Sequence, residues 1–366
     1  MGSGPADRAA ASLADFVATV SGDRALRVEE NFGDGFVRLR VGEAERRQAK
    51  HDIRCVEDAV IEMLRNARDA SSRTILVATT REGAQRSVVM LDDGCGIPLS
   101  MQDRVFDARV TSKLDSVHMD RWGIHGRGMA LYSIRENATS ARVMASAPGL
   151  GTAMRVDFDA TELVERKDQS TWPTVGKDEE GEPLLRGPHN IIRTCCEFAL
   201  DQRGVCDVYL GSPAEVLATV RQLTASSPND SRLLFVDDVS EVAVLERASV
   251  AGDARELADI AAGLGLSISE RTAHRILAGQ IRPLRSIAAR ITHHANSRDA
   301  GASEIDLLRD RRGLRISGDD SEEFSRMLER DFDYIAQRYY LSLSREPRIR
   351  VSHDKITVTF ELEKHD

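Results

Sequence analysis

Asp92-Asp93-Gly94-Cys95-Gly96-Ile97-Pro98 is an acidic, glycine-rich segment that directly follows an apolar run. That run, Arg86 to Leu91, and the preceding run Thr74 to Thr80 predict two strands joined by a turn at Glu82-Gly83. Glycines two positions apart allow backbone conformations that other residues avoid, so the loop can approach a ligand closely. We therefore expect a hairpin whose second strand ends in a ligand-binding loop.

A polar stripe lies on the helix expected upstream of this hairpin. Glu62, Asn66 and Asp69 are spaced i, i+4 and i+7 and so fall on one helix face. They border the apolar stripe of the same helix, which consists of Val56, Val60, Met63 and Ala67. Arg65 and Arg68 are expected to point away from both stripes. Carboxylates and an amide at the edge of a buried face are typical of a helix that lines a cleft.

A second glycine-rich loop, Gly123-Ile124-His125-Gly126-Arg127-Gly128, leads into a helix expected to begin near Met129. Unpaired N–H groups and the positive end of the dipole converge at a helix N-terminus, which favours phosphate. The loop is not a Walker P-loop, because no Lys-Ser or Lys-Thr follows its last glycine, and it is not a GxGxxG fingerprint.

These three segments, in this order and spacing, resemble the N-box, G1 box and G2 box of GHKL ATPases. That family includes gyrase-type topoisomerases, mismatch-repair ATPases, heat-shock chaperones and histidine kinases. Gly151-Thr152, before an expected strand, resembles the family's adenine-side element. The resemblance covers about 100 residues. It implies an α+β chain containing a Bergerat-type two-layer α/β sandwich, with a mixed sheet and helices on one face, that binds ATP and Mg²⁺.

The resemblance also implies roles for matching positions. Asp92 would accept a hydrogen bond from the adenine amino group, and Thr152 would support the same edge. Asn66 would help to coordinate Mg²⁺, and Asp69 would support the site through other side chains. Two glycines, Gly94 and Gly96, would let the loop approach the nucleotide.

A lid over the nucleotide is implied for roughly residues 101 to 128. Its hinge and phosphate contacts would come from Gly123, Gly126 and Gly128. Lys113 at the lid base could pair with phosphate, although an ordinary solvated lysine fits the sequence equally well. Members of the family commonly dimerise through the lid or an N-terminal arm, so a homodimer is a further implication.

Glu62 bears on the type of reaction. In the hydrolases that the chain resembles, a glutamate four positions before the Mg²⁺ asparagine acts as general base toward water. Serine kinases of the anti-sigma type also have a glutamate there. Hydrolysis is favoured, while a kinase acting on a separate protein and a non-hydrolysing ATP sensor stay open. A two-component histidine kinase is not indicated, because His51 is expected on the same continuous helix as Glu62.

The chain divides by composition into several expected parts. These are an N-terminal arm (1–50), the ATP-binding domain (51–160), a linker (161–188), a small α/β unit (189–250), a helical module (251–300) and a C-terminal helix and hairpin (301–366). The pattern is helical over 6–20, about 43–70, and 321–343. A terminal hairpin is expected over 348–362, with its turn at His353-Asp354.

The helical module resembles a helix-turn-helix, with Leu257 to Ser267 and Ser269 to Gly279 as its two halves. About two extra residues separate the turn glycine from the second helix, compared with the usual spacing. Between Arg271 and Arg315 there are ten arginines and four acidic residues. DNA is therefore an expected partner of residues 255–296, and the alternative is a helical packing or dimerisation module with a solvated basic face.

The overall composition limits the partners and the cellular location that the chain can have. The 366 residues contain 50 Lys and Arg and 59 Asp and Glu, a net charge of −9, which argues against coating nucleic acid through global charge. No apolar stretch approaches the roughly 20 residues that a membrane span requires. The N-terminus has no basic flank or apolar region of a signal peptide, so we expect a cytoplasmic protein. Five cysteines without a CxxC pair indicate reduced thiols.

Overall fold

The computed structural model describes most of the chain up to residue 291 and short segments of the remainder. The described residues are 28–112, 118–120, 122–125, 128–177, 183–225, 238–291, 325, 328, 332, 341–344, 347–351 and 356–364. The chain forms two compact units, Met1–Ser297 and Arg298–Asp366. Each is described by itself.

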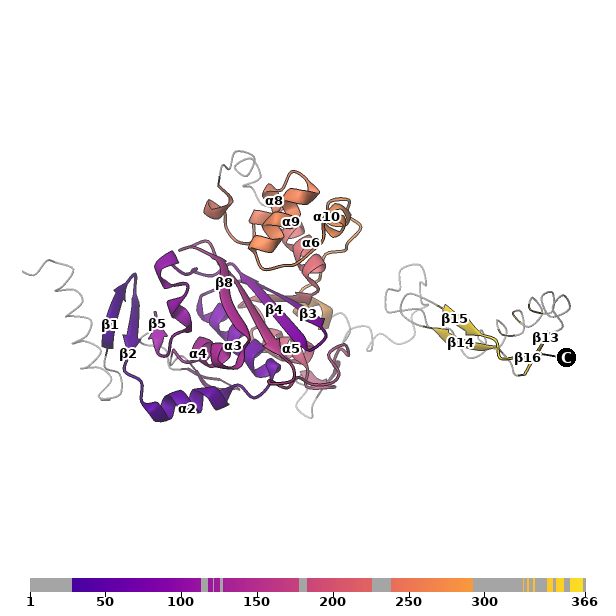
Figure 1. Cartoon of the computed structure of the whole chain (residues 1–366), viewed down its shortest axis with the longest axis horizontal. Helices are drawn as coiled ribbons and strands as arrows, with labels where there is room; N and C mark the ends of the chain where they lie inside the picture. The colour runs from indigo at the N-terminus through magenta and orange to yellow at the C-terminus, as the bar shows by residue number, and fades with distance from the viewer. Residues whose placement is uncertain are drawn as a thin grey trace, which may run out of the picture. The chain divides into compact units, whose positions relative to one another are not determined.

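A five-stranded mixed sheet is the centre of the first unit (Figure 1). Its order is β12 (Asp207–Gly211), β3 (Thr74–Glu82), β4 (Gln85–Asp92), β9 (Thr152–Asp159) and β8 (Ser140–Ser146). β12 pairs parallel with β3, and the other neighbours are antiparallel. The predicted β3–β4 hairpin is confirmed, and β9 is the strand expected after Gly151.

Three helices cover one face of this sheet: α3 (Val56–Asp69), α4 (Ala130–Asn137) and α5 (Ile191–Asp201). Their apolar side chains bury sheet residues such as Val156 and Phe158 completely. The start of α4 next to Met129 agrees with the sequence. Sheet and helices together confirm the predicted α+β fold of the Bergerat type.

The opposite face of the sheet is also covered. Four helices lie there: α6 (Pro213–Thr224), α8 (Arg247–Val250), α9 (Ala254–Gly263) and α10 (Glu270–Leu277). Leu76 and Leu91 of the sheet are fully buried in the same cluster as Leu217 and Leu257 of the helices. The chain thus adds its own third layer to the sandwich that the resemblance implied.

The helix expected from about 43 to 70 is in fact two helices, and the prediction of one continuous helix is wrong. α2 (Glu43–Asp52) ends before Ile53, whose extended backbone brings its side chain into the core, where it is 3% exposed. Cys55, also extended, is the N-cap residue directly before α3. Burial of Ile53 therefore outweighs the local helical preference, and His51 does not share a helix with Glu62.

The described residues of the segment 161–188, expected as a linker, are part of the first unit and contribute to its core. Leu163 and Leu185 are buried in its core, and Val56 donates a backbone hydrogen bond to Val164. The segment contains a hairpin of β10 (Thr174–Lys177) and β11 (Pro183–Arg186). Because β12 joins the central sheet, part of the expected 189–250 unit belongs to the same layer. The domain boundaries given above stay a proposal.

Smaller elements complete the first unit. β1 (Val28–Gly33), β2 (Phe36–Leu39) and β5 (Val110–Thr111) form a three-stranded sheet, and β6 (His118–Asp120) pairs with β7 (Gly123–His125). Within the described ranges, single-turn helices occur at η1 (Leu99–Met101), η2 (Arg104–Phe106) and η3 (Val239–Glu241). The helix expected over 6–20 lies outside the described residues.

The described residues of the second unit include two strand pairs. β14 (Arg348–Val351) and β15 (Ile356–Thr359) form the predicted hairpin, whose turn lies outside the described residues. β13 (Leu341–Leu343) pairs with β16 (Leu362–Lys364), so the end of the helix expected over 321–343 is a strand. Among the described residues, no helix is long and apolar enough to cross a bilayer.

Candidate nucleotide-binding site

One pocket, of about 170 Å³, brings six of the predicted site residues together. They are Asn66, Asp69, Asp92, Gly96, Gly128 and Thr152. Apolar walls come from Met63, Met90, Ile97 and Met154. A pocket with a few polar groups on largely apolar walls is typical of a small-molecule site.

Asp92 at the end of β4 is the most deeply buried acid of the pocket, with 7% exposure. Its Oδ1 accepts hydrogen bonds from the Gly94 amide at 2.8 Å and the Ser72 hydroxyl at 3.0 Å. In the described part of the chain nothing donates to Oδ2. Burial raises the pKa of Asp92 to about 6, although both hydrogen bonds oppose the shift. At neutral pH, therefore, Oδ2 is mainly a carboxylate acceptor.

Thr152 lies beside Asp92 because the two residues are paired across β4 and β9. Its Oγ1 is 3.1 Å from the Ser146 hydroxyl, which in turn accepts the Ile97 amide at 2.8 Å. The hydroxyls of Ser72 and Ser146 were not predicted as part of the site. The sequence gives no indication of these two hydroxyls, except that Ser72 and Ser146 are close to Asp69 and Gly151 along the chain.

Gly96 has the backbone conformation that the loop requires, with φ of +71°. A Cβ there would lie 1.9 Å from the Ala147 carbonyl oxygen, so no side chain fits. Gly94 does not line the pocket. A Cβ on Gly94 would lie 2.6 Å from the Ser72 hydroxyl, so this glycine leaves room for the hydrogen bonds at Asp92.

The polar stripe of α3 is only partly in the pocket. Asn66 and Asp69 line it, and Glu62, one turn earlier, does not. The Nδ2 of Asn66 is buried and has no hydrogen-bond partner among the described residues. An amide with unused hydrogen-bonding capacity next to an open pocket fits a site that a ligand completes. Asp69 accepts a hydrogen bond from Arg68 at 3.0 Å.

The expectation that Arg65 points away from the polar and apolar stripes is wrong. Arg65 is 2% exposed, and its guanidinium donates to Glu62 at 2.5 Å. α3 is packed on a second side by α5, so the face expected to meet solvent is buried. A buried cation needs a counter-charge, and Glu62 supplies one. Arg68 was also expected to point away from the polar stripe, but it pairs with Asp69 of that stripe.

The other end of the pocket is the N-terminus of α4. Gly128, Ala130 and Leu131 line the pocket there. Met129, the residue that caps the helix, offers no side-chain hydrogen bond to its free amides. These amides are suited to an anionic group. Gly123 lies in β7, whereas Lys113 and Gly126 lie outside the described residues.

A mixed sheet under three helices, with a buried acid at one strand end and a helix N-terminus on the same pocket, is the arrangement expected of a GHKL ATPase domain. Residues 51–162 match the family described as "Histidine kinase-, DNA gyrase B-, and HSP90-like ATPase". This confirms the family that the sequence motifs indicated, for that segment of the chain.

Curated relatives match the same region. The DNA mismatch repair protein MutL of Thermus aquaticus is 42% identical over 85 residues, which are 23% of this chain and 15% of that protein. The DNA mismatch repair protein MutL of Thermus thermophilus is 42% identical over 83 residues, with the same shares. The similarity thus spans less than one sixth of these relatives.

Proposed function

We propose that this chain is a Mg²⁺-dependent ATPase of low turnover whose nucleotide state controls a DNA-binding module. The observation that carries the nucleotide part is the shared pocket of Asp92 and the α4 N-terminus. The Oδ2 of Asp92 would accept the adenine amino group, which guanine lacks at that position. The uncapped amides of α4 would receive phosphate oxygens.

Asn66 would hold the magnesium ion through its side-chain oxygen. Its amide lines the pocket, and the unsatisfied Nδ2 would donate to a phosphate oxygen of the magnesium nucleotide while the side-chain oxygen holds the ion. The ion would neutralise phosphate charge and keep the phosphates in one orientation. Hard oxygen ligands such as an amide oxygen suit Mg²⁺.

Glu62 would act as general base toward water. It lies one helical turn from Asn66 on α3, and its carboxylate is fixed by Arg65. A fixed carboxylate can orient a water and accept its proton. This proposal also explains why Glu62 lies outside the lining of the pocket, since a base toward water need not contact the nucleotide itself.

The link to the helical module is proposed on the contacts of β9. This strand begins with Thr152 in the pocket, and three residues later the Nη1 of Arg155 donates to the Gly265 carbonyl and the Ser267 hydroxyl, both at 3.2 Å. Gly265 and Ser267 lie between α9 and α10. A shift of β9 on nucleotide binding would therefore reach the turn between the two helices.

α10 would be the DNA-reading helix. Ala273 and Ile276 bury one side of it, and Arg271, His274 and Arg275 are exposed. Ser269 caps its N-terminus by accepting the Thr272 amide. The relatives named as DNA mismatch repair proteins support a role on DNA. The arginines would contact phosphates or base edges.

A kinase that phosphorylates a separate protein is the second candidate, and a non-hydrolysing ATP sensor is the third. Glu62 favours a reaction over sensing, because a base is unnecessary for binding alone. Within the kinase alternative, the same glutamate would activate a protein hydroxyl in place of water.

A turnover assay with the purified chain, with and without duplex DNA, tests the proposal. We expect slow phosphate release from ATP that changes when DNA is added, and no release by Glu62→Ala. Transfer of the labelled γ-phosphate to an added protein without phosphate release would support the kinase instead. Binding without either reaction would support the sensor.

A further inference from the structure

A second cavity, of about 230 Å³, lies at the β12 edge of the sheet and shares no lining residue with the nucleotide pocket. Its walls come from β3 and β4, the start of α5, the end of β12, the start of α6 and the segment around residues 284–290. The α5 and α6 N-termini each contribute residues, namely Ile191 and Ser212. Their dipoles favour negative charge in the cavity.

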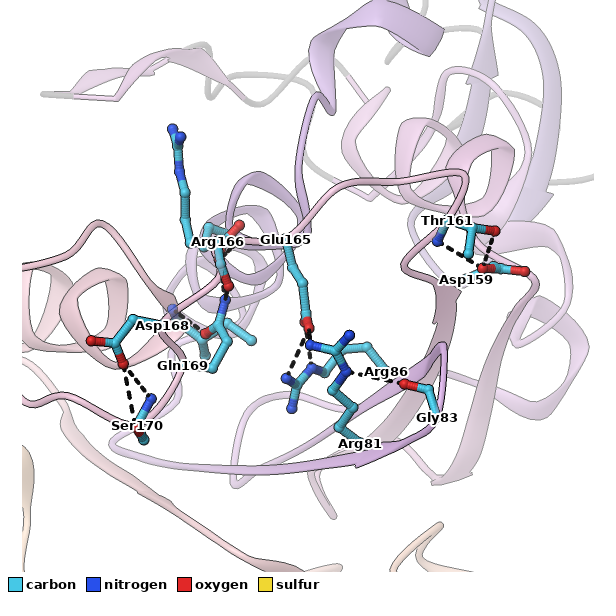
Figure 2. A network of polar contacts seen from close by, with 12 residues as sticks. Arg81, Gly83, Arg86, Asp159, Thr161, Glu165, Arg166, Asp168, Gln169 and Ser170 are labelled. Carbon is cyan, nitrogen blue, oxygen red and sulfur yellow. Dashed lines mark hydrogen bonds and ion pairs between the residues drawn. The ribbon is translucent and has the colours of Figure 1, made fainter.

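Arg86, 6% exposed, lines this cavity. Its Nε and Nη2 donate to the Glu165 carboxylate at 2.7 and 3.2 Å, and in the described part of the chain nothing accepts from Nη1. Figure 2 shows that the same carboxylate also faces the guanidinium of Arg81, which donates to it. The carboxylate of Glu165 thus accepts from both arginines, so the network carries a net positive charge. The Nη1 of Arg86 remains available as a donor.

Arg290 brings a second guanidinium to the cavity. It stacks 3.5 Å from the centroid of the Trp172 ring, and both residues line the cavity. Among the described residues it has no carboxylate within ion-pair distance, and burial lowers its pKa. Stacking fixes the plane of the guanidinium while its N–H edges stay available to a planar or tetrahedral oxyanion.

Glu215 is the acidic group of the cavity. Its Oε2 accepts the Ser212 amide at 2.9 Å and the Ser212 hydroxyl at 2.7 Å. No donor among the described residues reaches its Oε1. A bare oxyanion would be repelled by this carboxylate, whereas an oxyanion that keeps a proton could donate a hydrogen bond to it.

We propose that this cavity binds a protonated phosphate group, with Arg86 and Arg290 as donors to its oxygens and Glu215 as acceptor from its hydroxyl. At neutral pH inorganic phosphate and the monoanion of a phosphomonoester carry such a proton. Sulfate carries none, so the carboxylate of Glu215 discriminates against it. The site is independent of the proposed ATPase activity, because none of its residues lines the nucleotide pocket.

Calorimetry of the full chain with inorganic phosphate at neutral pH tests the site, and Trp172 fluorescence in a Trp122→Phe background gives a second readout. We expect saturable binding that weakens about 10-fold or more in Arg290→Met and is unchanged in Arg285→Met, a control on an exposed arginine of the same segment. Sulfate should bind about 10-fold or more weaker than phosphate, and Glu215→Gln should remove most of that difference.

Asp92→Asn distinguishes the second cavity from the nucleotide pocket. This variant should impair ATP binding and leave phosphate binding unchanged. Glycerol phosphate in place of inorganic phosphate shows whether the cavity prefers a phosphomonoester or free phosphate. Tighter binding of either one supports the site. The proposal is overturned if the wild type binds no phosphate, if Arg290→Met binds it equally well, if sulfate competes as an equal, or if Asp92→Asn abolishes phosphate binding.

Discussion

The guanidinium of Arg65, whose side chain is 2% exposed, donates to the carboxylate of Glu62 across one turn of α3. The pair joins a buried cation to the proposed catalytic base. Removing either partner takes one charged contact from the other side chain in a protein interior. The geometry of Glu62 and the stability of α3 are therefore expected to depend on the same contact.

A double-mutant cycle with Glu62→Gln and Arg65→Met measures this contact. We expect each single variant to lower the free energy of unfolding, and the double variant to lose about 1–3 kcal/mol less than the sum, because the pair is removed as a unit. Urea unfolding provides the values. Additive losses would show that the two side chains are not energetically coupled.

Glu62→Ala should separate binding from reaction. Since Glu62 does not line the nucleotide pocket, the affinity for Mg-ATP should stay within about 3-fold of the wild type, while turnover falls about 100-fold or more. Parallel calorimetry and phosphate-release assays check both quantities. Normal turnover in Glu62→Ala would remove this residue as the base.

The buried carboxyl of Asp92 predicts a pH dependence of stability. Its pKa is raised from 3.8 to about 6 in the folded chain, so the native state binds this proton more tightly than the unfolded state. Its contribution to the free energy of unfolding is therefore full below about pH 4 and decreases by about 3 kcal/mol as the pH rises through 6.

Unfolding of the wild type and Asp92→Asn without nucleotide tests this sign. The stability of the variant relative to the wild type should increase between about pH 4 and 6 and then stay constant. A relative stability that does not change over this range would contradict the assigned environment of Asp92.

Gly96→Ala should distort the loop that contributes Gly96 to the lining of the pocket. The new Cβ would lie 1.9 Å from the Ala147 carbonyl oxygen at a φ of +71°. Gly83→Ala is a matched control, because Gly83 has a φ of +59° and open space around the Cβ position. We expect a cost of about 1 kcal/mol for the control and clearly more for Gly96→Ala, with about 10-fold weaker ATP binding in the latter only.

Substitution of Arg271 and Arg275 tests whether the helical module binds DNA. The double change to alanine should weaken retention of duplex DNA about 10-fold and reduce the salt dependence of binding, because two phosphate or base contacts are lost. Arg166→Ala, an exposed arginine outside residues 255–296, is the control and should have little effect. If the wild type retains no DNA, the proposed module is not a DNA-binding element.

Several residues that line the candidate nucleotide pocket could be predicted because their placement follows from local sequence patterns. Asp92 follows its strand directly, and Asn66 and Asp69 are placed on one face by helical spacing alone. The strand register then brings Thr152 next to Asp92, as an antiparallel pair of the predicted strands allows.

The features that sequence analysis missed depend on residues far away in the chain. Arg65 is buried because α5, more than a hundred positions later, covers its side of α3. β12 enters the sheet by parallel pairing with β3, a contact that no local pattern encodes. Likewise, nothing near Arg86 indicates that Arg290 lines the same cavity. Long-range packing decides these positions.

Titration calorimetry of the wild type and Asp92→Asn with Mg-ATP tests the nucleotide site most directly. We predict saturable 1:1 binding by the wild type that GTP does not reproduce, and binding about 100-fold weaker in Asp92→Asn with no loss of thermal stability. Absence of binding by the wild type, or equal affinity of a folded Asp92→Asn variant, would contradict the account.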